Sequence, residues 1–299
     1  MTTSVFARAY AKINWGLELI GRRDDGYHEI VTLTHTVSLA DGVTVGPLDK
    51  GPRLETGGQW PVPAGAQNLC WRAAIAYADA LGVAPSLHIR LDKQIPPAAG
   101  LGGGSSDAVA VLLAAERILG GGTEGLVGRL AAELGSDTVL FLHGGAAVCS
   151  GRGEIVTPIS CPRRYHLVLA RPDVDVSTRE AYAAIGSQDF TDGGLTRELA
   201  SRLAAGASPG ELAPHSCNAF VRAVFERYPQ IRDVAESLQS AGAPLVRMTG
   251  SGSAVFAVFA TAARAAEVAS DLSGHGTWAV AAHTLEHGVQ LDATIGESR

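Results

Sequence analysis

The sequence predicts an α+β protein of two units, each with a mixed or antiparallel sheet and helices packed on one side. Segments with a period of two, typical of half-buried strands, alternate with helical segments that carry capping residues. The 299 residues suffice for two domains of ordinary size. Pro158 and Pro162 follow a glycine-punctuated stretch. We therefore expect an N-terminal domain over 1–158 and a C-terminal domain over 159–299.

The N-terminal third of the chain is typical of strands. Residues 31–39, VTLTHTVSL, alternate apolar and polar side chains, and residues 15–19 do the same. An Asp25-Gly26 step between these two segments predicts a turn over 21–29.

Capping residues mark the helices that follow. Asn68 is a good N-cap and Gly82 a good C-cap, and Ser105 and Ser106 stand where the next helix begins. The patterns predict, in order, a helix between Asn68 and Gly82, a strand over 86–92, helices over 106–119 and 124–134, and a strand-like stretch over 141–154.

The second unit opens with a buried strand, because residues 166–172 are almost continuously apolar. Residues 186–214 are polar and rich in glycine, which predicts a loop with one short helix. The rest of the chain predicts helices over 217–227, 230–241 and 262–272, a strand, glycine turn and strand over 245–260, and a last strand over 277–284.

Composition excludes several classes of function. The net charge of -6 and pI of about 5.8 give no electrostatic footprint for nucleic acid or an anionic membrane. No apolar run reaches the roughly 18 residues that span a bilayer, and the N-terminus lacks the pattern of a signal peptide. The cysteines form no CxxC pair and the histidines no HExxH motif. We expect a cytoplasmic protein with free thiols that acts on small molecules.

The segment PPAAGLGGGSSDA lies between a predicted strand and a predicted helix. Glycines let the backbone approach a ligand closely, and a helix N-terminus offers unpaired N–H groups and a partial positive charge. Together they predict an anion site, most often one for phosphate. No lysine follows the loop as in a P-loop, and Ser105 holds the last glycine place of G-x-G-x-x-G, so neither common nucleotide motif is present.

Three stretches together resemble the GHMP kinases, the superfamily of galactokinase and of homoserine, mevalonate and phosphomevalonate kinases. PPAAGLGGGSSDA is similar to their second motif, which wraps the triphosphate of ATP, and MTGSGSAVFAVF, residues 248–259, is similar to their third. AKINWGLELIGRRDDGYHE, residues 11–29, resembles the signature of the member that phosphorylates a hydroxyl of a cytidine diphosphate-linked polyol in the non-mevalonate isoprenoid pathway.

The resemblance implies a two-domain kinase with its active site in the cleft between the domains, and ATP and Mg²⁺ as cofactors. By the same resemblance, Lys12 is the catalytic lysine and Asp137 the general base. Lys12 is one of three lysines in a chain with 21 arginines, so a compact charge is wanted there. Asp137 lies in Gly-Ser-Asp-Thr-Val, where the family shows Gly-Ala-Asp-Val-Pro, and it also suits a helix N-cap.

The remaining site residues are also implied by the resemblance. Tyr27 would stack on the cytosine and His28 would hydrogen-bond its edge, although both side chains could simply pack locally. The substrate-binding residues would be Asn14, Tyr27, His28, Thr178 and Tyr182. The ATP-binding residues would be Pro97, Ala98, Ala99, Gly100, Leu101, Gly102, Gly103, Gly104, Ser105 and Ser106, with Asn68 and Lys93 near the adenine.

Some questions stay open in the sequence. No glutamate ligand for Mg²⁺ can be placed by motif, and Ser106 is offered as one protein ligand. Ala219 follows Asn218 where the family shows aspartate. A mevalonate or homoserine kinase is the main alternative, although those substrates carry no base for Tyr27 to stack on. A non-catalytic nucleotide-binding module and a dinucleotide-dependent oxidoreductase are less favoured. The sequence does not choose between a monomer and a homodimer.

Overall fold

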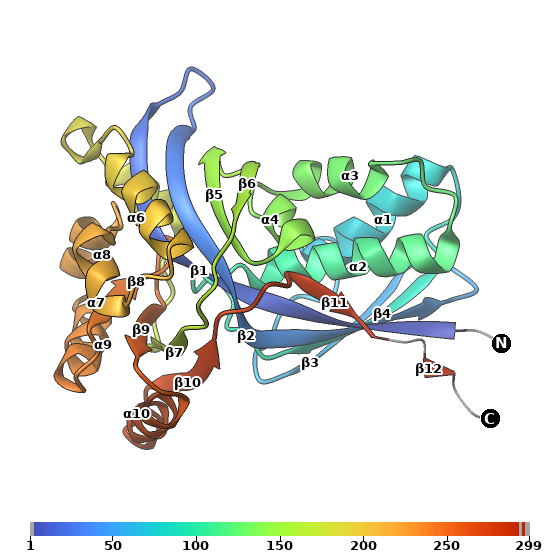
Figure 1. The fold of residues 1–299 in the computed structure, drawn as a ribbon. Helices are drawn as coiled ribbons and strands as arrows, with labels where there is room; N and C mark the ends of the chain where they lie inside the picture. The colour runs from blue at the N-terminus through green and yellow to red at the C-terminus, as the bar shows by residue number, and fades with distance from the viewer. Residues whose placement is uncertain (1–2, 293–294, 297–299) are drawn as a thin grey trace.

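A computed structural model of the chain describes residues 3–292 and 295–296. Within that part, the strands form one eight-stranded sheet and one four-stranded sheet. Figure 1 shows helices α1 to α4 on one side of the larger sheet, and helices α8, α9 and α10 around the smaller sheet at the other end of the molecule. The predicted α+β fold with two sheets is confirmed.

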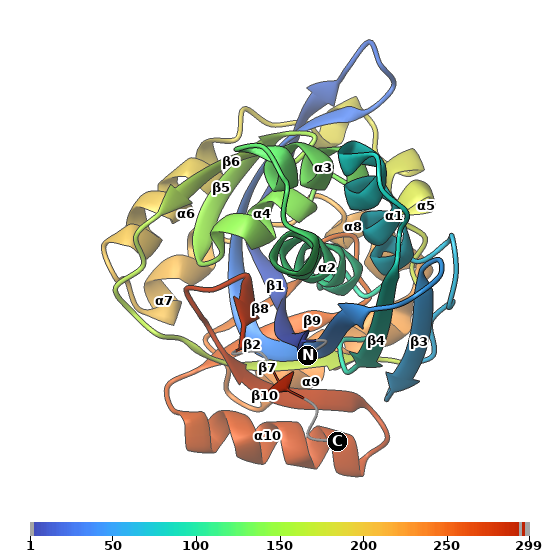
Figure 2. The same cartoon turned by 90° about the vertical axis from the view of Figure 1, so that its right-hand side faces the viewer.

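Strands β1 (Thr3–Arg22) and β2 (His28–Pro47) form an antiparallel hairpin of 20 residues on each side. Gly26, with φ of 84°, lies in the turn that the Asp-Gly step predicts. Three register shifts interrupt the ladder, and such bulges increase the local bend and twist of a strand. The tip of the hairpin projects from the rest of the molecule (Figures 1 and 2). One hairpin thus carries Lys12 as well as Tyr27 and His28.

The other strands of the larger sheet pair around this hairpin. Strand β4 pairs with the C-terminal half of β2 and strand β5 with its N-terminal half. The last two strands pair with β1, so the C-terminal end of the chain joins the larger sheet. The sequence does not predict this pairing, because such short strands show no clear alternation. The boundary at 158–159 stays a prediction. These strands are β3 (Arg53–Gly58), β4 (Leu87–Lys93), β5 (Ala146–Gly151), β6 (Ile155–Ile159), β11 (Val289–Leu291) and β12 (Ile295–Gly296).

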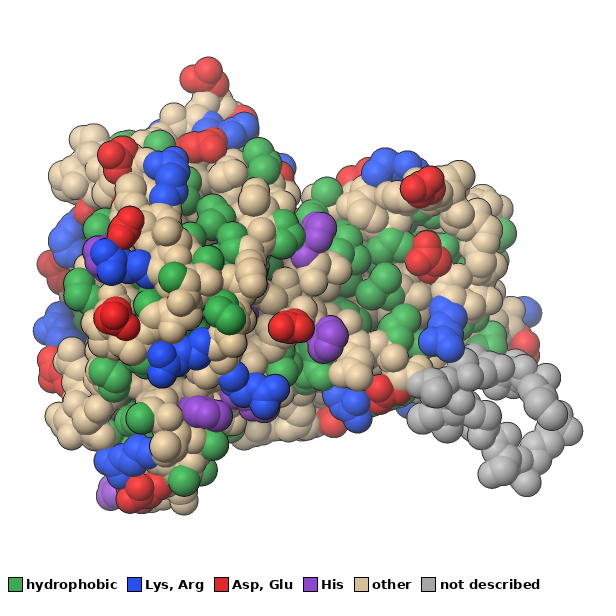
Figure 3. Space-filling view, in the orientation of Figure 1, with side chains coloured by type: hydrophobic (Ala, Val, Ile, Leu, Met, Phe, Trp, Pro, Cys, Tyr) green, Lys and Arg blue, Asp and Glu red, His purple; other side chains and the backbone are tan. Residues whose placement is uncertain are grey.

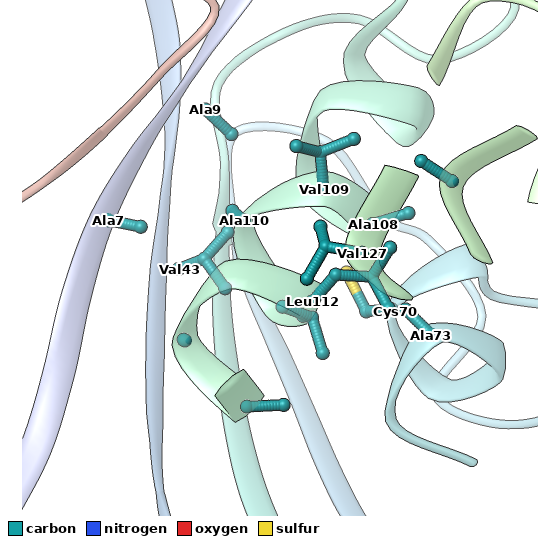
Figure 4. Close-up of a cluster of buried hydrophobic side chains, with 14 of the residues drawn as sticks. Ala7, Ala9, Val43, Cys70, Ala73, Ala108, Val109, Ala110, Leu112 and Val127 are labelled. Atoms are coloured by element: carbon teal, nitrogen blue, oxygen red, sulfur yellow. The ribbon is translucent and has the colours of Figure 1, made fainter. Parts of the chain in front are cut away.

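Helices α1 (Leu69–Leu81), α2 (Gly103–Leu119) and α3 (Leu126–Leu134) cover one face of the larger sheet. Figure 2 shows α2 nearly end-on between the sheet and the other helices. Small side chains such as Ala108 and Ala110 are fully buried and let α2 lie close to its neighbours. In Figure 4 they meet Val43 of the sheet and Cys70 of α1. Core packing therefore fixes how α2 lies against the sheet and α1.

Helix α2 begins at Gly103 and not at Ser106. Gly102 is its N-cap, with φ of 72°, so Ser105 and Ser106 already lie inside the helix. Ser106 is buried, and its hydroxyl donates to the carbonyl of Gly103 at 2.9 Å. The prediction that the serines cap α2 is wrong, because Gly102 takes the left-handed conformation that ends the loop. The free N–H groups of the helix therefore belong to glycines.

The caps of α1 are confirmed, since the Asn68 side chain accepts the N–H of Cys70 and Gly82 has φ of 67°. The strand-like stretch over 141–154 is only partly correct. Its start belongs to helix α4 (Thr138–His143), which two glycines of positive φ then end, and β5 begins after them. A short apolar run such as VLFL fits a buried helix as well as a strand.

The smaller sheet agrees with the strands predicted for the second unit, whereas the helix predicted over 217–227 begins only at Val221. Its order is β10-β7-β9-β8, with every neighbouring pair antiparallel. Helices α9 and α10 pack against these strands. The elements are β7 (His166–Arg171), β8 (Leu245–Met248), β9 (Val255–Phe259), β10 (Trp278–His283), α8 (Val221–Arg227), α9 (Pro229–Ser240) and α10 (Ala262–Gly274).

Residues 186–214 are largely helical, so the predicted loop is wrong. Helix α6 (Gly194–Ala204) buries Leu199 and Leu203 against β1, and α7 (Pro209–Leu212) follows. The four-residue spacing of these leucines is the signal that the glycine content obscures. A short helix α5 (Thr178–Ala183) precedes this region, and its N-cap Ser177 accepts the N–H of Glu180.

The two sheets share a hydrophobic core. Trp15 of β1 is fully buried and packs edge-on against Tyr165 at 5.0 Å and Phe256 at 5.5 Å between ring centroids. Leu167 and Leu169 of β7 belong to the same cluster. A core shared in this way holds the two sheets at a fixed separation.

Helices in residues 3–292 fall short of the length and apolar character needed to cross a membrane. On the face shown in Figure 3, charged side chains of both signs are interspersed with hydrophobic ones.

Acid is expected to destabilise the fold through His35. Its ring is buried and accepts the indole N–H of Trp15, and burial lowers the pKa of His35 from 6.5 to about 4. The unfolded chain therefore takes up a proton near pH 6.5 that the folded chain takes up only near pH 4. The free energy of unfolding should fall by up to about 3 kcal/mol as the pH decreases through this range. Urea unfolding of the wild type and of His35→Gln would measure it, and equal acid sensitivity would contradict the assignment to His35.

Candidate active site

A cavity of about 920 Å³ lies where the hairpin, the glycine loop, α4, α5 and the turn at 249–251 meet. Seven predicted site residues line it with their side chains or backbone: Lys12, Asn14, Tyr27, His28, Asp137, Thr178 and Tyr182. From the glycine loop, Ala98, Gly100 and Gly102 line it as well. The structure thus brings together all of the predicted catalytic and substrate-binding residues.

The glycine loop is pressed against the turn at 249–251. Gly100 has φ of 76°, and a Cβ there would lie 2.2 Å from the carbonyl oxygen of Thr249. Gly102 has φ of 72°, and its Cβ would lie 2.8 Å from the ring of Phe141. Both positions therefore require glycine for conformation and for space. The loop residues Ala99 and Leu101 point into the core.

Lys12 is buried, with 4% of its side chain exposed. Its ammonium donates to Oδ1 of Asn14 at 2.6 Å and to the carbonyl oxygen of Gly100 at 2.7 Å. Burial lowers the pKa of Lys12, and the charge of Asp137 opposes this effect. The ammonium is thus fixed beside the glycine loop with one side toward the cavity.

Asp137 faces Lys12 across the cavity, with 4.0 Å between Oδ2 and Nζ. It stands at the N-cap of α4, yet its side chain makes no capping hydrogen bond within the described structure. About half of the side chain, 51%, is exposed. The carboxylate is therefore available to accept a proton from a ligand hydroxyl, and the Lys12 ammonium lies beside it.

Asn14 organises the site from within. Its Oδ1 accepts hydrogen bonds from Lys12, from the Thr249 hydroxyl at 3.1 Å and from the N–H of Gly250 at 2.9 Å. Its Nδ2 donates to the hydroxyl of Thr32 at 2.8 Å. The amide is thus occupied by protein partners, and its geometry favours positioning of Lys12 over direct contact with substrate.

The sequence leaves the role of Asn218 open, and the structure supplies one. Its Nδ2 donates to the carbonyl oxygens of Met248 and Gly250, each at 2.8 Å, and its Oδ1 accepts the N–H of Phe220 at 2.9 Å. Asn218 therefore holds the turn that supports the glycine loop. The neighbouring Ala219 donates its backbone N–H to Leu17, which an alanine does as well as an aspartate.

Aromatic rings gather at the other end of the cavity. The His28 ring lies 5.2 Å from that of Tyr182 and 6.0 Å from that of Phe190, measured between centroids. Burial lowers the pKa of His28 and raises that of Tyr182 to about 12, so both are neutral near pH 7. Tyr27 is 57% exposed at the hairpin tip, which leaves a face of its ring open for stacking.

Thr178 and Tyr182 both come from α5, where residues four positions apart share one face, and they line the cavity together. The Thr178 hydroxyl lies 3.1 Å from that of Ser251. A helix of six residues thus connects the aromatic end of the cavity to the turn beside the glycine loop.

Lys93 is not brought into the cavity. Its ammonium is buried and bonded to the carboxylates of Asp41 and Asp107, the latter at 2.6 Å. Burial opposes the charge of Lys93, but the two carboxylates reverse this effect and raise its pKa. The Lys93 ammonium therefore has a structural role in this cluster, and an approach of this residue to the adenine stays a prediction. Asn68, likewise, is occupied as the cap of α1.

The cavity offers few protein ligands for a metal ion. No cluster of three His, Cys, Asp or Glu residues occurs in the described part of the chain. Asp137 is the one acidic residue among the described lining residues, and the Ser106 hydroxyl bonds to the backbone inside α2. These residues fit a metal that is held mainly by a bound nucleotide.

Comparisons with known proteins agree with this geometry. Residues 68–145 match the model for the GHMP kinases N terminal domain, and residues 197–277 match that for the GHMP kinases C terminal. A 4-diphosphocytidyl-2-C-methyl-D-erythritol kinase of Methylacidiphilum infernorum is 39% identical over 87% of this chain and 88% of its own. The kinase of the same name from Mycolicibacterium smegmatis is 39% identical over 92% of this chain and 88% of its own.

Solved structures give the same result. A crystal structure of 4-(cytidine 5'-diphospho)-2C-methyl-D-erythritol kinase superposes with a TM-score of 0.79 and 34% identity, over 93% of this chain and 98% of that one. A homoserine kinase from Cytophaga hutchinsonii shares the fold, with a TM-score of 0.76 and 20% identity over 97% of each chain. By sequence and by structure, the chain belongs to the GHMP kinases and, within them, to the family of 4-diphosphocytidyl-2-C-methyl-D-erythritol kinases.

Proposed function

We propose that this chain transfers the γ-phosphate of ATP to the 2-hydroxyl of 4-diphosphocytidyl-2-C-methyl-D-erythritol, giving ADP and the 2-phosphate, in the non-mevalonate isoprenoid pathway. The observation that carries the proposal is a single cavity with Lys12 and Asp137 at one end and aromatic rings at the other. A cytidine diphosphate-linked polyol has both a base to stack and a hydroxyl to phosphorylate. The names of the relatives support the same substrate.

Phosphoryl transfer requires positioning and charge stabilisation more than covalent chemistry. In the proposed reaction, Asp137 accepts the proton of the 2-hydroxyl. Lys12, held by Asn14 and the Gly100 carbonyl, stabilises charge that develops on the transferred group. The N–H groups at the start of α2 bind ATP phosphates. Mg²⁺ would be held mainly by those phosphates and would supply charge neutralisation.

We place the reaction in the cytoplasm, where the free cysteines would stay reduced. The test is an assay that couples ADP release to each candidate alcohol in turn. Turnover of the cytidyl substrate, with none of mevalonate or homoserine, is the expected result. Turnover of either of those alcohols in preference would overturn the substrate assignment.

Removing the aromatic side chains at the hairpin tip should weaken binding of the cytidyl substrate and leave ATP binding unchanged. A stacked base contributes about 1–3 kcal/mol, so Tyr27→Ala is expected to raise the KM for the cytidyl substrate by roughly tenfold. His28→Ala should raise it similarly and reduce the preference for cytidine over uridine, because a hydrogen bond to the base edge is lost. Steady-state KM values for both substrates would decide. An unchanged KM for the cytidyl substrate in both variants would place the base elsewhere.

Two neighbouring glycines should respond differently to valine. A Cβ on Gly103 would lie 2.8 Å from Nζ of Lys93, so Gly103→Val is expected to disturb the buried core and lower the Tm. Gly104 is exposed, and the nearest described neighbour of its Cβ is Leu69 Cδ1 at 3.7 Å. Gly104→Val should therefore keep the Tm within a few degrees and weaken ATP binding, because the side chain covers the helix N–H groups.

Thermal unfolding and ATP titration of both variants provide the measurement. Normal ATP binding by Gly104→Val would mean that phosphates do not approach this turn of α2.

A further inference from the structure

Arg152 lies between the two ends of the cavity. It belongs to the turn that joins β5 and β6, and it lines the cavity itself. The next residue, Gly153, lies against the reaction end, since a Cβ there would be 3.7 Å from Oδ1 of Asp137. The Arg152 guanidinium lies 5.0 Å from the centroid of the Tyr27 ring, at the base end. One short turn therefore touches both ends.

The charges around the cavity leave Arg152 available for an anion. The cations lining the cavity are Lys12, Arg22, Arg152 and Arg179, against Asp137 as the one acid among the described lining residues. Lys12 and Asp137 offset each other, which leaves three guanidinium groups. Arg152 has Glu154 nearby, but Nε and Oε1 are 3.7 Å apart, too far for a hydrogen bond. Its N–H groups are thus not fully used by that carboxylate.

We propose that Arg152 binds the diphosphate that joins the cytidine to the polyol, and so selects cytidine diphosphate derivatives over cytidine alone. The inference rests on the proposed function. A substrate with its base at Tyr27 and its hydroxyl at Asp137 has its diphosphate between them, and the β5–β6 turn occupies that interval. A guanidinium presents a planar set of donors that matches phosphate oxygens, and such charge-assisted bonds are strong.

A competing role for Arg152 is to orient the Tyr27 ring through the cation–π contact alone. The two roles differ in which ligands they affect. A residue that orients the ring contributes to every ligand that contains the base. A residue that binds the diphosphate contributes only to ligands that contain it, and its contribution decreases with added salt.

Calorimetric titration of the full-length protein with cytidine, CMP and CDP separates these roles. Arg152→Met should raise the Kd for CDP by about tenfold, the value of one charge-assisted hydrogen bond in a partly exposed site. The Kd for cytidine should stay within about twofold of wild type, and Arg152→Lys should retain part of the CDP affinity. Arg53→Met is the matched control, because Arg53 is 64% exposed and lies outside the lining residues.

The KM for the cytidyl substrate should rise with the Kd for CDP, and the KM for ATP should not change. Equal weakening of cytidine and CDP by Arg152→Met would overturn the inference in favour of ring orientation, and unchanged CDP affinity would overturn it outright. Either result could occur in a protein that still phosphorylates the cytidyl substrate, so the proposed function would stand. A wild type that neither binds CDP nor turns over the cytidyl substrate would overturn both.

Discussion

Replacing Asp137 by asparagine is expected to lower kcat by about 100-fold or more and to leave the KM for ATP nearly unchanged. The asparagine keeps the shape of the side chain but cannot accept the hydroxyl proton. It also removes the charge that lies 4.0 Å from the Lys12 ammonium. Because Asp137 is half exposed and makes no capping bond in the described structure, the fold should not depend on it.

Steady-state kinetics with both substrates, together with thermal unfolding, measure this effect. Asp173→Asn is the matched control, since Asp173 is exposed and lies outside the lining residues. An Asp137→Asn variant with wild-type kcat would remove Asp137 from its proposed role. A variant with a raised KM for ATP and an unchanged kcat would assign it to nucleotide binding instead.

The largest loss of stability is expected for Lys93→Met, about 3–5 kcal/mol, because removing one partner leaves buried carboxylates unpaired. Lys93 of β4 bonds Asp41 of β2 and Asp107 of α2, and all three side chains are nearly inaccessible. Burial raises the pKa of Asp107 well above its usual range even with Lys93 present. Without Lys93, Asp107 should take up a proton more readily.

A carboxyl whose pKa is higher in the folded state destabilises the fold as the pH rises above its unfolded value. The deficit of Lys93→Met should therefore shrink as the pH falls from 7 toward 5, as measured by urea unfolding. Lys50→Met, a loss of an exposed lysine, is the control. The double variant Lys93→Met/Asp107→Asn should recover part of the loss, because it removes one of the unpaired charges. A Lys93→Met variant as stable as Lys50→Met would contradict the role of this cluster.

Elements with a clear period were predictable from the sequence, and elements decided by tertiary contacts were not. Asn68 and Gly82 cap α1 as expected, because capping depends on local chemistry alone. The start of α2 was placed too late, because serines usually cap helices, whereas Gly102 does so here. Helix α6 was missed because its glycine-rich flanks outweighed the spacing of Leu199 and Leu203.

The candidate site shows the same division. Lys12 and Asp137 stand out by motif, and the structure places them 4.0 Å apart. Lys93 also stands out as a rare lysine, but its partner Asp41 is 52 positions away, so no local pattern reveals that it is buried. Asn218 was equally hidden, because its two acceptors lie 30 and 32 positions away on another element. Residues that position others are found through long-range contacts.

The length of the β1–β2 hairpin sets the distance between the two ends of the cavity. The ladder runs from Lys12 opposite Thr36 to Arg22 opposite His28, so both the reacting end and the ring end are mounted on one pair of strands. Each added residue pair lengthens such a ladder by about 3.4 Å. Because side chains alternate between the two faces of a sheet, adding two pairs at once leaves every side chain on the face it had before. The number of pairs between the two ends sets the span of any molecule that touches both. A relative with a shorter hairpin would therefore fit a shorter substrate, even with the same lysine, aspartate and glycine loop.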